Sequence, residues 1–395
     1  MSETTISVPA VWVLTNAPSP YQVELFSAVA QGAGVDLDVR FLRESLSPGP
    51  PRRFPNRICR TWLALTSGDE LRLHGSPIRE AAWGKYDLYL LSGLYTSMTF
   101  LACAGLLYLR GKPWAIWWER PRAQVPDQQR AFPVRWLHRF KNKVRDWLLR
   151  NAKLVIGIGS AAVEEYEQLG VPRERLRMLP YCCDVTRFAA VPTATRDAMR
   201  EQLGWQNHLV FLFSGQMIPR KGIDTLLKSF IPLAEKYADV ALLLLGDGED
   251  KTKLEALVPE PLRSRVRFLG QVPQSQLPDY FSAADIFAFP SRHDGWAVVL
   301  NEACGAGLPI IATNQVGAAH DLVTEGENGF RVEADDVAGL LAKLEWCSTH
   351  RDQLPAMGLR SRELVQPFSV EQGAQTLVEH VHYCLRDTAS HPLPT

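Results

Sequence analysis

Two short segments in the second half of the chain carry charged residues beside glycines, where a strand pattern gives way to a helix pattern. The first, residues 213–224, reads FSGQMIPRKGID, and we expect a helix to begin near Gly222. Gly215 lets the backbone approach a ligand closely, and Arg220 and Lys221 precede the helix, whose N–H groups favour an anion. The segment indicates diphosphate binding, although two solvated charges before a helix would read equally well. It lacks the glycine and lysine spacing of a P-loop.

The second segment, residues 289–309, reads FPSRHDGWAVVLNEACGAGLP and places two acids on either side of a helix start. Asp294 falls in the loop, we expect the helix to begin near Trp296, and Glu302 lies about two turns further on. Open α/β sheets bind ligands where strands end opposite helix N-termini, and carboxylates there can accept hydrogen bonds from a sugar diol. Taken singly, a turn residue and a helix-surface acid are the better interpretations.

Short apolar runs alternate with helical patterns along the whole chain, which indicates parallel sheets covered on both faces. We therefore expect an α/β fold with two doubly wound domains. The strand-like runs are 10–14, 37–42, 88–91, 114–117, 154–158, 209–213, 241–245, 265–269, 286–289, 309–312 and 329–332.

The length of 395 residues exceeds one ordinary core, so two domains are expected. Small residues and a Val-Pro pair near residues 184–207 indicate the crossing between them. We predict an N-terminal domain over residues 1–190 and a C-terminal domain over 191–370. A last helix, residues 371–387, is predicted to cross back to the N-terminal domain.

Composition narrows the possible partners and location. Lys+Arg and Asp+Glu both number 43, which disfavours a general nucleic-acid binder. Seven cysteines without a CxxC spacing disfavour a disulfide framework or a zinc site. With no basic and apolar leader at the N-terminus, we expect a cytoplasmic protein. The apolar stretch 98–109 is too short to cross a bilayer and predicts a buried helix.

Together these segments resemble the family 4 glycosyltransferases of the GT-B fold. Asp294 and Glu302 are spaced as in that family's E-x7-E motif, with Asp in the first place. The similarity is specific over residues 210–332 and diffuse before that. Other stretches that carry it are 15–22, 169–172, 246–248, 284–291, 316–317 and 326–330. The resemblance implies two Rossmann-like domains facing a central cleft, with the acceptor bound by the first and a nucleotide sugar by the second.

Roles for particular residues follow from the resemblance alone. It implies that Glu302 binds the ribose, Asp294 contacts the transferred sugar, and Lys221 neutralises the diphosphate. The family often has Arg where this chain has Gln216, which is neutral and cannot make the same charged contact. The remaining donor-binding residues implied are Gly215, Gln216, Arg220, Gly246, Gly270 and Val272, with the backbone N–H groups of Gly295, Trp296 and Ala297 on the distal phosphate.

The implied activity is transfer of a hexosyl unit, with retention of anomeric configuration, from a nucleotide diphosphate sugar. A UDP-sugar is the default, and a saccharide or lipid-linked saccharide would accept the hexose in surface polysaccharide or glycoconjugate synthesis. Glu119, after the strand 114–117, is the candidate for contacting the acceptor or the sugar, against a plain charged loop residue. No metal is expected. Asp36 and Asp38 spell D-x-D, the metal motif of a different glycosyltransferase fold, but they lie in an alternating strand, where both would face solvent.

Residues 133–150 form the most basic stretch, with aromatic residues at helical spacing. Such a helix can lie on an anionic membrane and would make the enzyme peripheral, or it can be a core helix with a solvated basic face. Two other functions stay open on the same architecture. One is a nucleotide-sugar epimerase, and the other is a catalytically inactive protein that binds nucleotide sugars.

Overall fold

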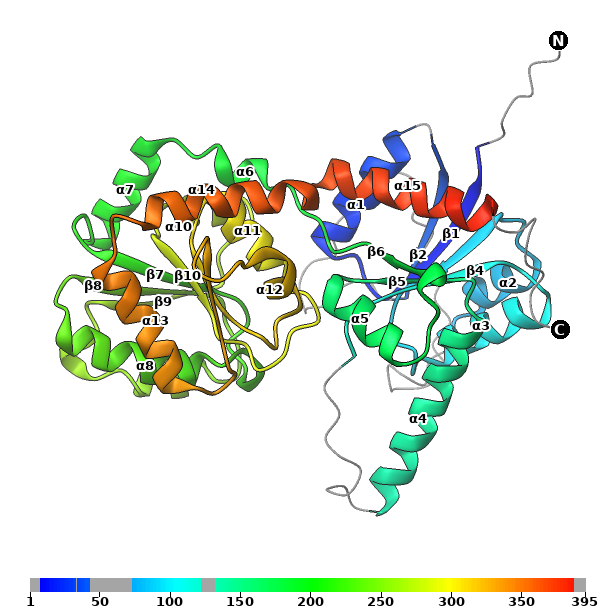
Figure 1. Cartoon of the computed structure of the whole chain (residues 1–395), viewed down its shortest axis with the longest axis horizontal. Coiled ribbons are helices and arrows are strands. Elements are labelled where there is room, and N and C mark those ends of the chain that lie inside the picture. The colour runs from blue at the N-terminus through cyan, green and yellow to red at the C-terminus, as the bar shows by residue number, and fades with distance from the viewer. Residues whose placement is uncertain (1–7, 33, 43–72, 122–131, 387–395) are drawn as a thin grey trace, which may run out of the picture. The chain divides into compact units, whose positions relative to one another are not determined.

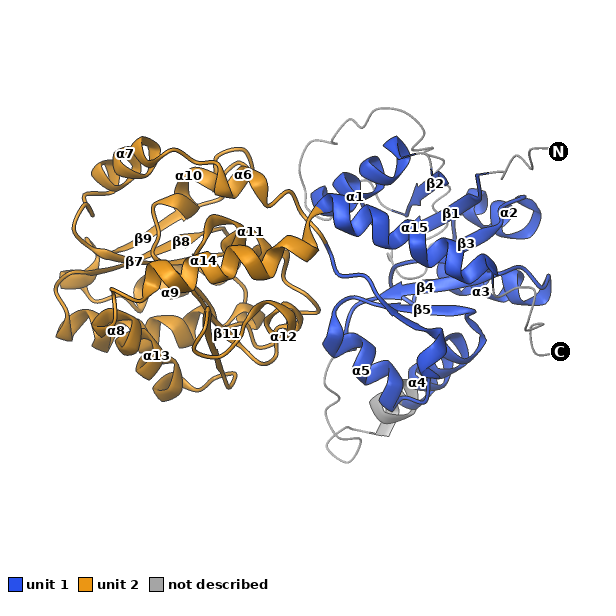
Figure 2. Ribbon diagram, turned by 45° about the horizontal axis from the view of Figure 1, so that its top comes forward, with its two compact units in different colours: residues 1–181, 370–395 blue, residues 182–369 orange. Residues whose placement is uncertain are grey.

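A computed structural model describes residues 8–32, 34–42, 73–121 and 132–386, the first seven residues of the last range in backbone only. The chain divides into two compact units, coloured blue and orange in Figure 2. Unit 1 comprises Met1–Tyr181 and Val370–Thr395, and unit 2 comprises Cys182–Ser369. The chain therefore passes from unit 1 to unit 2 between Tyr181 and Cys182, and returns at Val370.

Unit 1 is built on a parallel six-stranded sheet in the order β2-β1-β3-β4-β5-β6 (Figure 1). Its strands are β1 (Ala10–Thr15), β2 (Asp36–Phe41), β3 (Leu88–Leu91), β4 (Trp114–Trp118), β5 (Leu154–Gly157) and β6 (Leu176–Met178). Its helices are α1 (Pro20–Gln31), α2 (Gly75–Trp83), α3 (Met98–Leu109), α4 (Phe132–Asn151), α5 (Ser160–Gln168) and α15 (Val370–Arg386). All five strands predicted here are confirmed, while β6, of three residues, was not predicted.

The central strands of unit 1 are buried on both faces, which is why they read as continuous apolar runs. On one face, α1 and α15 lie side by side, and an ideal Cβ on Gly34 would come within 2.8 Å of Val378. On the other face, α2 and α3 pack over a core that includes Trp12, Tyr89 and Trp114.

Unit 2 is a second parallel six-stranded sheet, in the order β12-β11-β10-β7-β8-β9. Its strands are β7 (Leu209–Ser214), β8 (Val240–Leu245), β9 (Val266–Gly270), β10 (Ile286–Phe289), β11 (Ile310–Thr313) and β12 (Gly329–Val332). Its helices are α6 (Thr186–Ala189), α7 (Thr193–Leu203), α8 (Ile223–Lys236), α9 (Lys251–Ala256), α10 (Leu277–Ser282), α11 (Val298–Ala306), α12 (Gly317–Leu322), α13 (Val337–Thr349) and α14 (Leu354–Val365). All six strands predicted for this half are confirmed, so the doubly wound α/β prediction is correct for both units.

The strand order of unit 2 reverses between β7 and β10. From β7 the chain winds outward to β8 and β9, and from β10 it winds the other way to β11 and β12. Helices α8 and α13 lie together on one face of the sheet, and α11 and α14 on the other (Figure 1). After β7 and β10 the chain continues to opposite sides of the sheet, and open α/β sheets bind their ligands at such a reversal of strand order. The loops that follow β7 and β10 are the predicted segments.

None of the helices that the structure describes combines the length and the apolar character needed to cross a bilayer. In the same part of the chain, no three His, Cys, Asp or Glu side chains are grouped so as to hold a metal ion. Asp38 does not simply face solvent as expected, because it is 2.7 Å from Arg40 and accepts a hydrogen bond from Tyr86.

Candidate functional site

The loop after β7 reaches α8 through a tight turn. Pro219–Lys221 form one turn of 3-10 helix, and Gly222, at φ +67°, lets α8 begin at Ile223. A side chain at residue 222 would be strained by this backbone, and its Cβ would also lie 2.1 Å from the carbonyl oxygen of Pro290. The glycine therefore allows this loop to pack against the loop that follows β10.

The loop after β10 is fixed by hydrogen bonds from both sides. The hydroxyl of Ser291, which is fully buried, lies 3.1 Å from the carbonyl oxygens of both Arg220 and His293 and can donate its one hydrogen to either. The backbone N–H of Asp294 donates to Gln315 at 3.1 Å. Helix α11 begins at Val298 rather than near residue 296, because Ala297 adopts a left-handed backbone at φ +79°.

The two loops bring Lys221 and Asp294 into contact. The Lys221 ammonium donates to one oxygen of the Asp294 carboxylate, and both side chains are largely buried, at 12% and 15% exposed. Arg220 donates to the same carboxylate oxygen at 3.3 Å and to the His293 carbonyl at 2.7 Å. Two cations share one carboxylate, so the cluster carries a net positive charge and can accept an anion.

Glu302 points from α11 toward α6. Its carboxylate lies 3.5 Å from the guanidinium of Arg187, and the Glu302 side chain is 12% exposed. Arg187 was not among the predicted site residues, since nothing in its sequence neighbourhood marks it. Arg187 also lines a pocket of about 550 Å³, together with residues 190–192, 274, 275, 278 and 279. Arg187 therefore lies beside the Glu302 carboxylate and also lines this pocket.

The predicted glycines allow close contact among the loops after β7, β8 and β9. Gly246 has φ +124°, and a Cβ there would lie 1.8 Å from the carbonyl oxygen of Gly215. The Gly246 N–H donates to the carbonyl of Gly270, itself at φ +71°, at 2.8 Å. Of the two predicted non-glycine residues on these loops, Gln216 is exposed and Val272 half-buried.

The side chain of Trp296 belongs to the core rather than to the ligand side of the loop. It is 1% exposed, and its indole N–H donates to Asn301 at 3.0 Å. The predicted contact of this residue involves its backbone only, and the buried ring fixes the position of that backbone.

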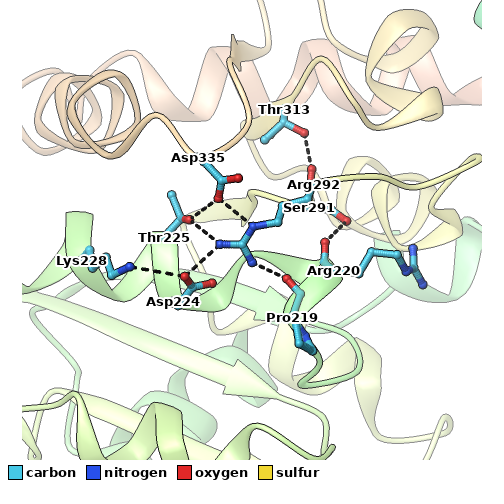
Figure 3. Close-up of polar contacts among 9 residues, drawn as sticks. All are labelled: Pro219, Arg220, Asp224, Thr225, Lys228, Ser291, Arg292, Thr313 and Asp335. Atoms are coloured by element: carbon cyan, nitrogen blue, oxygen red, sulfur yellow. Dashed lines mark hydrogen bonds and ion pairs between the residues drawn. The ribbon is translucent and has the colours of Figure 1, made fainter. Parts of the chain in front are cut away.

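Arg292 is the side chain that the prediction missed beside Asp294. Figure 3 shows its guanidinium at the centre of a polar cluster, whereas the Arg220 side chain points away from that cluster. Arg292 donates to Asp335 at 2.7 Å, to Asp224 at 2.9 Å and to the backbone carbonyl of Pro219. Burial pushes the pKa of the Asp224 carboxyl upward, but Arg292 outweighs it, and the pKa falls below its ordinary value.

Glu119 belongs to unit 1 and is exposed just after β4. Its backbone carbonyl accepts a hydrogen bond from the Tyr166 hydroxyl at 2.6 Å. The pKa of the Tyr181 hydroxyl is raised well above its ordinary value, mainly by burial and to a smaller extent by the charge of the Glu119 carboxylate. Tyr181 therefore stays protonated and can donate a hydrogen bond. Glu119 therefore sits at the carboxyl end of the sheet of unit 1, beside two tyrosines.

The part of the chain that contains the two loops is similar to a known family of proteins. Residues 195–363 match the model of the glycosyl transferases group 1. The mannosylfructose-phosphate synthase of Agrobacterium fabrum is 28% identical over 208 residues, which cover 50% of this chain and 46% of that protein. The GDP-mannose-dependent alpha-(1-6)-phosphatidylinositol monomannoside mannosyltransferase of Mycolicibacterium smegmatis is 30% identical over 199 residues, 48% of this chain and 52% of that protein. The chain thus spans about half the length of the curated relatives it matches.

Solved structures extend the likeness to nearly the whole chain. The HepE protein of Anabaena, solved in complex with UDP, has a TM-score of 0.70 at 18% sequence identity. The match covers 94% of this chain and 99% of HepE. At this identity the likeness shows the fold, which is the two-domain α/β GT-B fold expected from the sequence.

Proposed function

We propose that the chain, whose residues 195–363 match the model of the glycosyl transferases group 1, is a hexosyltransferase. It moves a hexosyl unit from a nucleotide diphosphate sugar to a saccharide acceptor and retains the anomeric configuration. The observation that carries the proposal is the pairing of Lys221 and Arg220 with Asp294 where the strand order of unit 2 reverses.

The charge of this cluster suits the chemistry of glycosyl transfer. As the bond between sugar and phosphate breaks, the diphosphate gains negative charge and the sugar ring becomes cation-like. Cations fixed beside the diphosphate stabilise this transition state more than the bound substrate. Lys221 and Arg220 would stabilise the leaving group, and Asp294 would accept hydrogen bonds from the hydroxyls of the sugar. With two cations in this position, the proposed reaction requires no metal ion.

The nucleoside of the donor would bind next to the Glu302 carboxylate. The Glu302 carboxylate can accept both ribose hydroxyls, and the pocket that Arg187 lines provides room beside it. Two nucleotide bases are candidates for the donor. The resemblance found in the sequence favours a UDP-sugar, whereas relatives at about 30% identity are named for GDP-mannose. Both donors therefore belong in the test.

Glu119 is proposed to contact the acceptor hydroxyl or the transferred sugar. Its exposed position at the carboxyl end of β4 leaves the carboxylate accessible. A retaining transfer in which the acceptor attacks from the side of the departing diphosphate needs no protein nucleophile, so a binding role is sufficient.

The deciding experiment incubates the chain with UDP-sugars and GDP-mannose, with and without free and lipid-linked saccharide acceptors. We expect release of nucleoside diphosphate that depends on the acceptor, and NMR of the product should show a retained anomeric configuration. An isomerised sugar nucleotide formed without acceptor would identify an epimerase instead. Binding of nucleoside diphosphate without any turnover would identify an inactive scaffold.

A lipid-linked acceptor is the finer part of the proposal, and α4 supports it. Its exposed side chains include the cations Arg139, Lys143 and Arg150 and the apolar Phe140, which is 53% exposed. A basic helix with exposed aromatic rings can bind an anionic membrane surface. The chain should sediment with vesicles of anionic lipid but not with neutral ones, and Lys143→Glu should weaken that binding. Equal recovery with both vesicles would indicate a solvated helix face. The cytoplasmic location stays a prediction.

A further inference from the structure

We propose that Arg292 is a positioning residue that holds the Lys221 loop in place for the diphosphate. The inference rests on the proposed function of the same site. It concerns a residue whose side chain donates hydrogen bonds to residues other than Lys221 and Asp294.

Arg292 connects three segments that are far apart in the sequence. Its guanidinium donates to the Pro219 carbonyl on the loop after β7, to Asp224 in the first turn of α8, and to Asp335 just before α13 (Figure 3). Thr225 closes the cluster by accepting from Arg292 at 3.3 Å and donating to Asp335 at 3.1 Å. Only a planar guanidinium presents several donors in a fixed fork that reaches all these acceptors at once.

The backbone of Arg292 adds a second bond to the loop after β7. Its N–H donates to the carbonyl of Arg220 at 2.8 Å, so Arg292 binds two consecutive carbonyls of the 3-10 turn that ends at Lys221. Pro219 and Arg220 immediately precede Lys221, and Asp294 lies two residues after Arg292. Arg292 therefore contributes, together with Ser291, to fixing the loop that carries Lys221 relative to the loop that carries Asp294.

Electrostatics stabilise the ion pairs that Arg292 forms with Asp224 and Asp335. Hydrogen bonding to Asp224, followed by the charges of Asp224 and Asp335, raises the pKa of the Arg292 guanidinium further. The pKa of Asp224 is lowered, so this carboxyl stays ionised at neutral pH. Arg292 is 29% exposed and Asp224 31%, and the two groups form an ion pair at 2.9 Å.

The consequence for binding is specific. A displaced 3-10 turn would move the Lys221 ammonium, whereas contacts of the nucleoside on the side of Glu302 would stay in place. Losing Arg292 should therefore weaken binding of UDP or GDP about 10-fold or more, as expected when a charged hydrogen bond is lost. Binding of the uncharged nucleosides uridine and guanosine should change little.

A double-mutant cycle on the full chain tests the inference, with calorimetric titration of UDP and GDP as the readout. The variants are Arg292→Ala, Lys221→Ala and the pair. If Arg292 acts through Lys221, Arg292→Ala should have less than about a twofold effect once Lys221 is gone, because coupled residues are not additive. Arg292→Lys should recover only part of the affinity, and methylguanidinium added to Arg292→Ala should restore more.

Arg360→Ala is the matched control, since this arginine also binds two carboxylates, Glu327 and Glu363, but lies on α14 away from the loops. It should leave both affinities unchanged. Equal losses on Arg292→Ala with and without Lys221 would overturn the positioning role and leave the proposed function intact. If Arg292→Ala does not fold, Asp335→Asn enters the same cycle and is judged by the same criterion. A wild-type chain that binds neither UDP nor GDP would instead overturn the proposed function, and this inference with it.

Discussion

At the scale of single residues, the account depends on how charge is shared between the two loops. Lys221 is a buried cation with a carboxylate partner, and a diphosphate that approaches it must share or replace that partner. The strength of the Asp294 contact therefore bears on both substrate binding and turnover. Two substitutions separate these effects.

Removing the Lys221 ammonium should slow the reaction. Lys221→Ala is expected to cost about 1.5–3 kcal/mol of transition-state stabilisation, typical of a charged hydrogen bond. This corresponds to a decrease in kcat/KM of roughly 10- to 150-fold. Lys236→Ala is the control, because Lys236 is an exposed lysine of the same unit that pairs with Glu345. An unchanged kcat/KM for Lys221→Ala would remove this residue from the mechanism.

Neutralising Asp294 should act in opposite directions on binding and on turnover. Asp294→Asn frees the positive charge of Lys221 and Arg220, so UDP or GDP should bind about 3- to 10-fold more tightly at low salt. Turnover should fall, because the amide replaces the carboxylate that accepts sugar hydroxyls. Calorimetry and initial rates measure the two effects, with Asp239→Asn as reference, since Asp239 is an exposed carboxylate of the same unit that pairs with Arg351. Weaker nucleotide binding by Asp294→Asn would contradict the charge sharing described.

The sequence predicted Lys221 and Asp294 as candidates because each follows a strand pattern at a helix start, and Glu302 because it lies about two turns further on from Asp294. The structure brings the first two together, and the binding roles of all three stay predictions. Arg292 and Arg187 could not be predicted. Their acceptors lie between 43 and 115 positions away in the chain, and such contacts exist only once the sheet has formed.

At the scale of elements, glycines decide how closely the loops pack. Gly222 and Gly246 both adopt positive φ where another loop's carbonyl oxygen occupies the place of a side chain. The contact between the loops therefore requires a residue without a side chain at each position, as well as a positive φ.

Gly222→Ala should destabilise unit 2 and impair its site together. The variant would have both a left-handed backbone and a Cβ 2.1 Å from the Pro290 oxygen. Gly204→Ala is the matched control, since Gly204 has a similar φ of +73° but nothing within 4 Å of its Cβ. We expect the control to lose about 1 kcal/mol of unfolding free energy and Gly222→Ala about 1–3 kcal/mol more. Equal losses in chemical denaturation, with equal kcat/KM, would show that the loops do not depend on this contact.

Strands were more predictable than the ends of elements. The runs predicted as strands are long enough for their apolar character to stand out, whereas β6 contributes only Leu176–Met178 to the sheet. The start of α11 was predicted near residue 296, but the left-handed conformation of Ala297 delays it to Val298. Alanine gives no sign of positive φ, so the sequence could not indicate this turn.

At the scale of the whole molecule, the C-terminal helix belongs to the unit that contains the N-terminus. Helix α15 packs on α1, and His380 and Tyr383 hydrogen-bond the backbone beside β6 at 3.0 Å and 3.2 Å. Unit 1 is thus completed only by the last segment of the chain, and unit 2 is inserted within it. The stability of the two units should respond separately to mutation.

Leu377→Ala tests this division. Leu377 is 1% exposed on α15, and truncating a buried leucine typically costs about 2–5 kcal/mol. Hydrogen exchange should become faster in α1, α15 and the sheet of unit 1, and should stay unchanged in unit 2. The exposed Gln375→Ala on the same helix is the control. Faster exchange throughout unit 2 would mean that α15 stabilises both units alike.

The central claim is that the two loops at the strand reversal of unit 2 bind a nucleoside diphosphate. The most direct measurement is a crystal structure of the chain with bound UDP or GDP. We predict the diphosphate against the Lys221 ammonium, with the ribose hydroxyls at the Glu302 carboxylate and Arg292 still bound to Pro219. A nucleotide bound elsewhere, with Lys221 and Glu302 free of contact to it, would contradict the account.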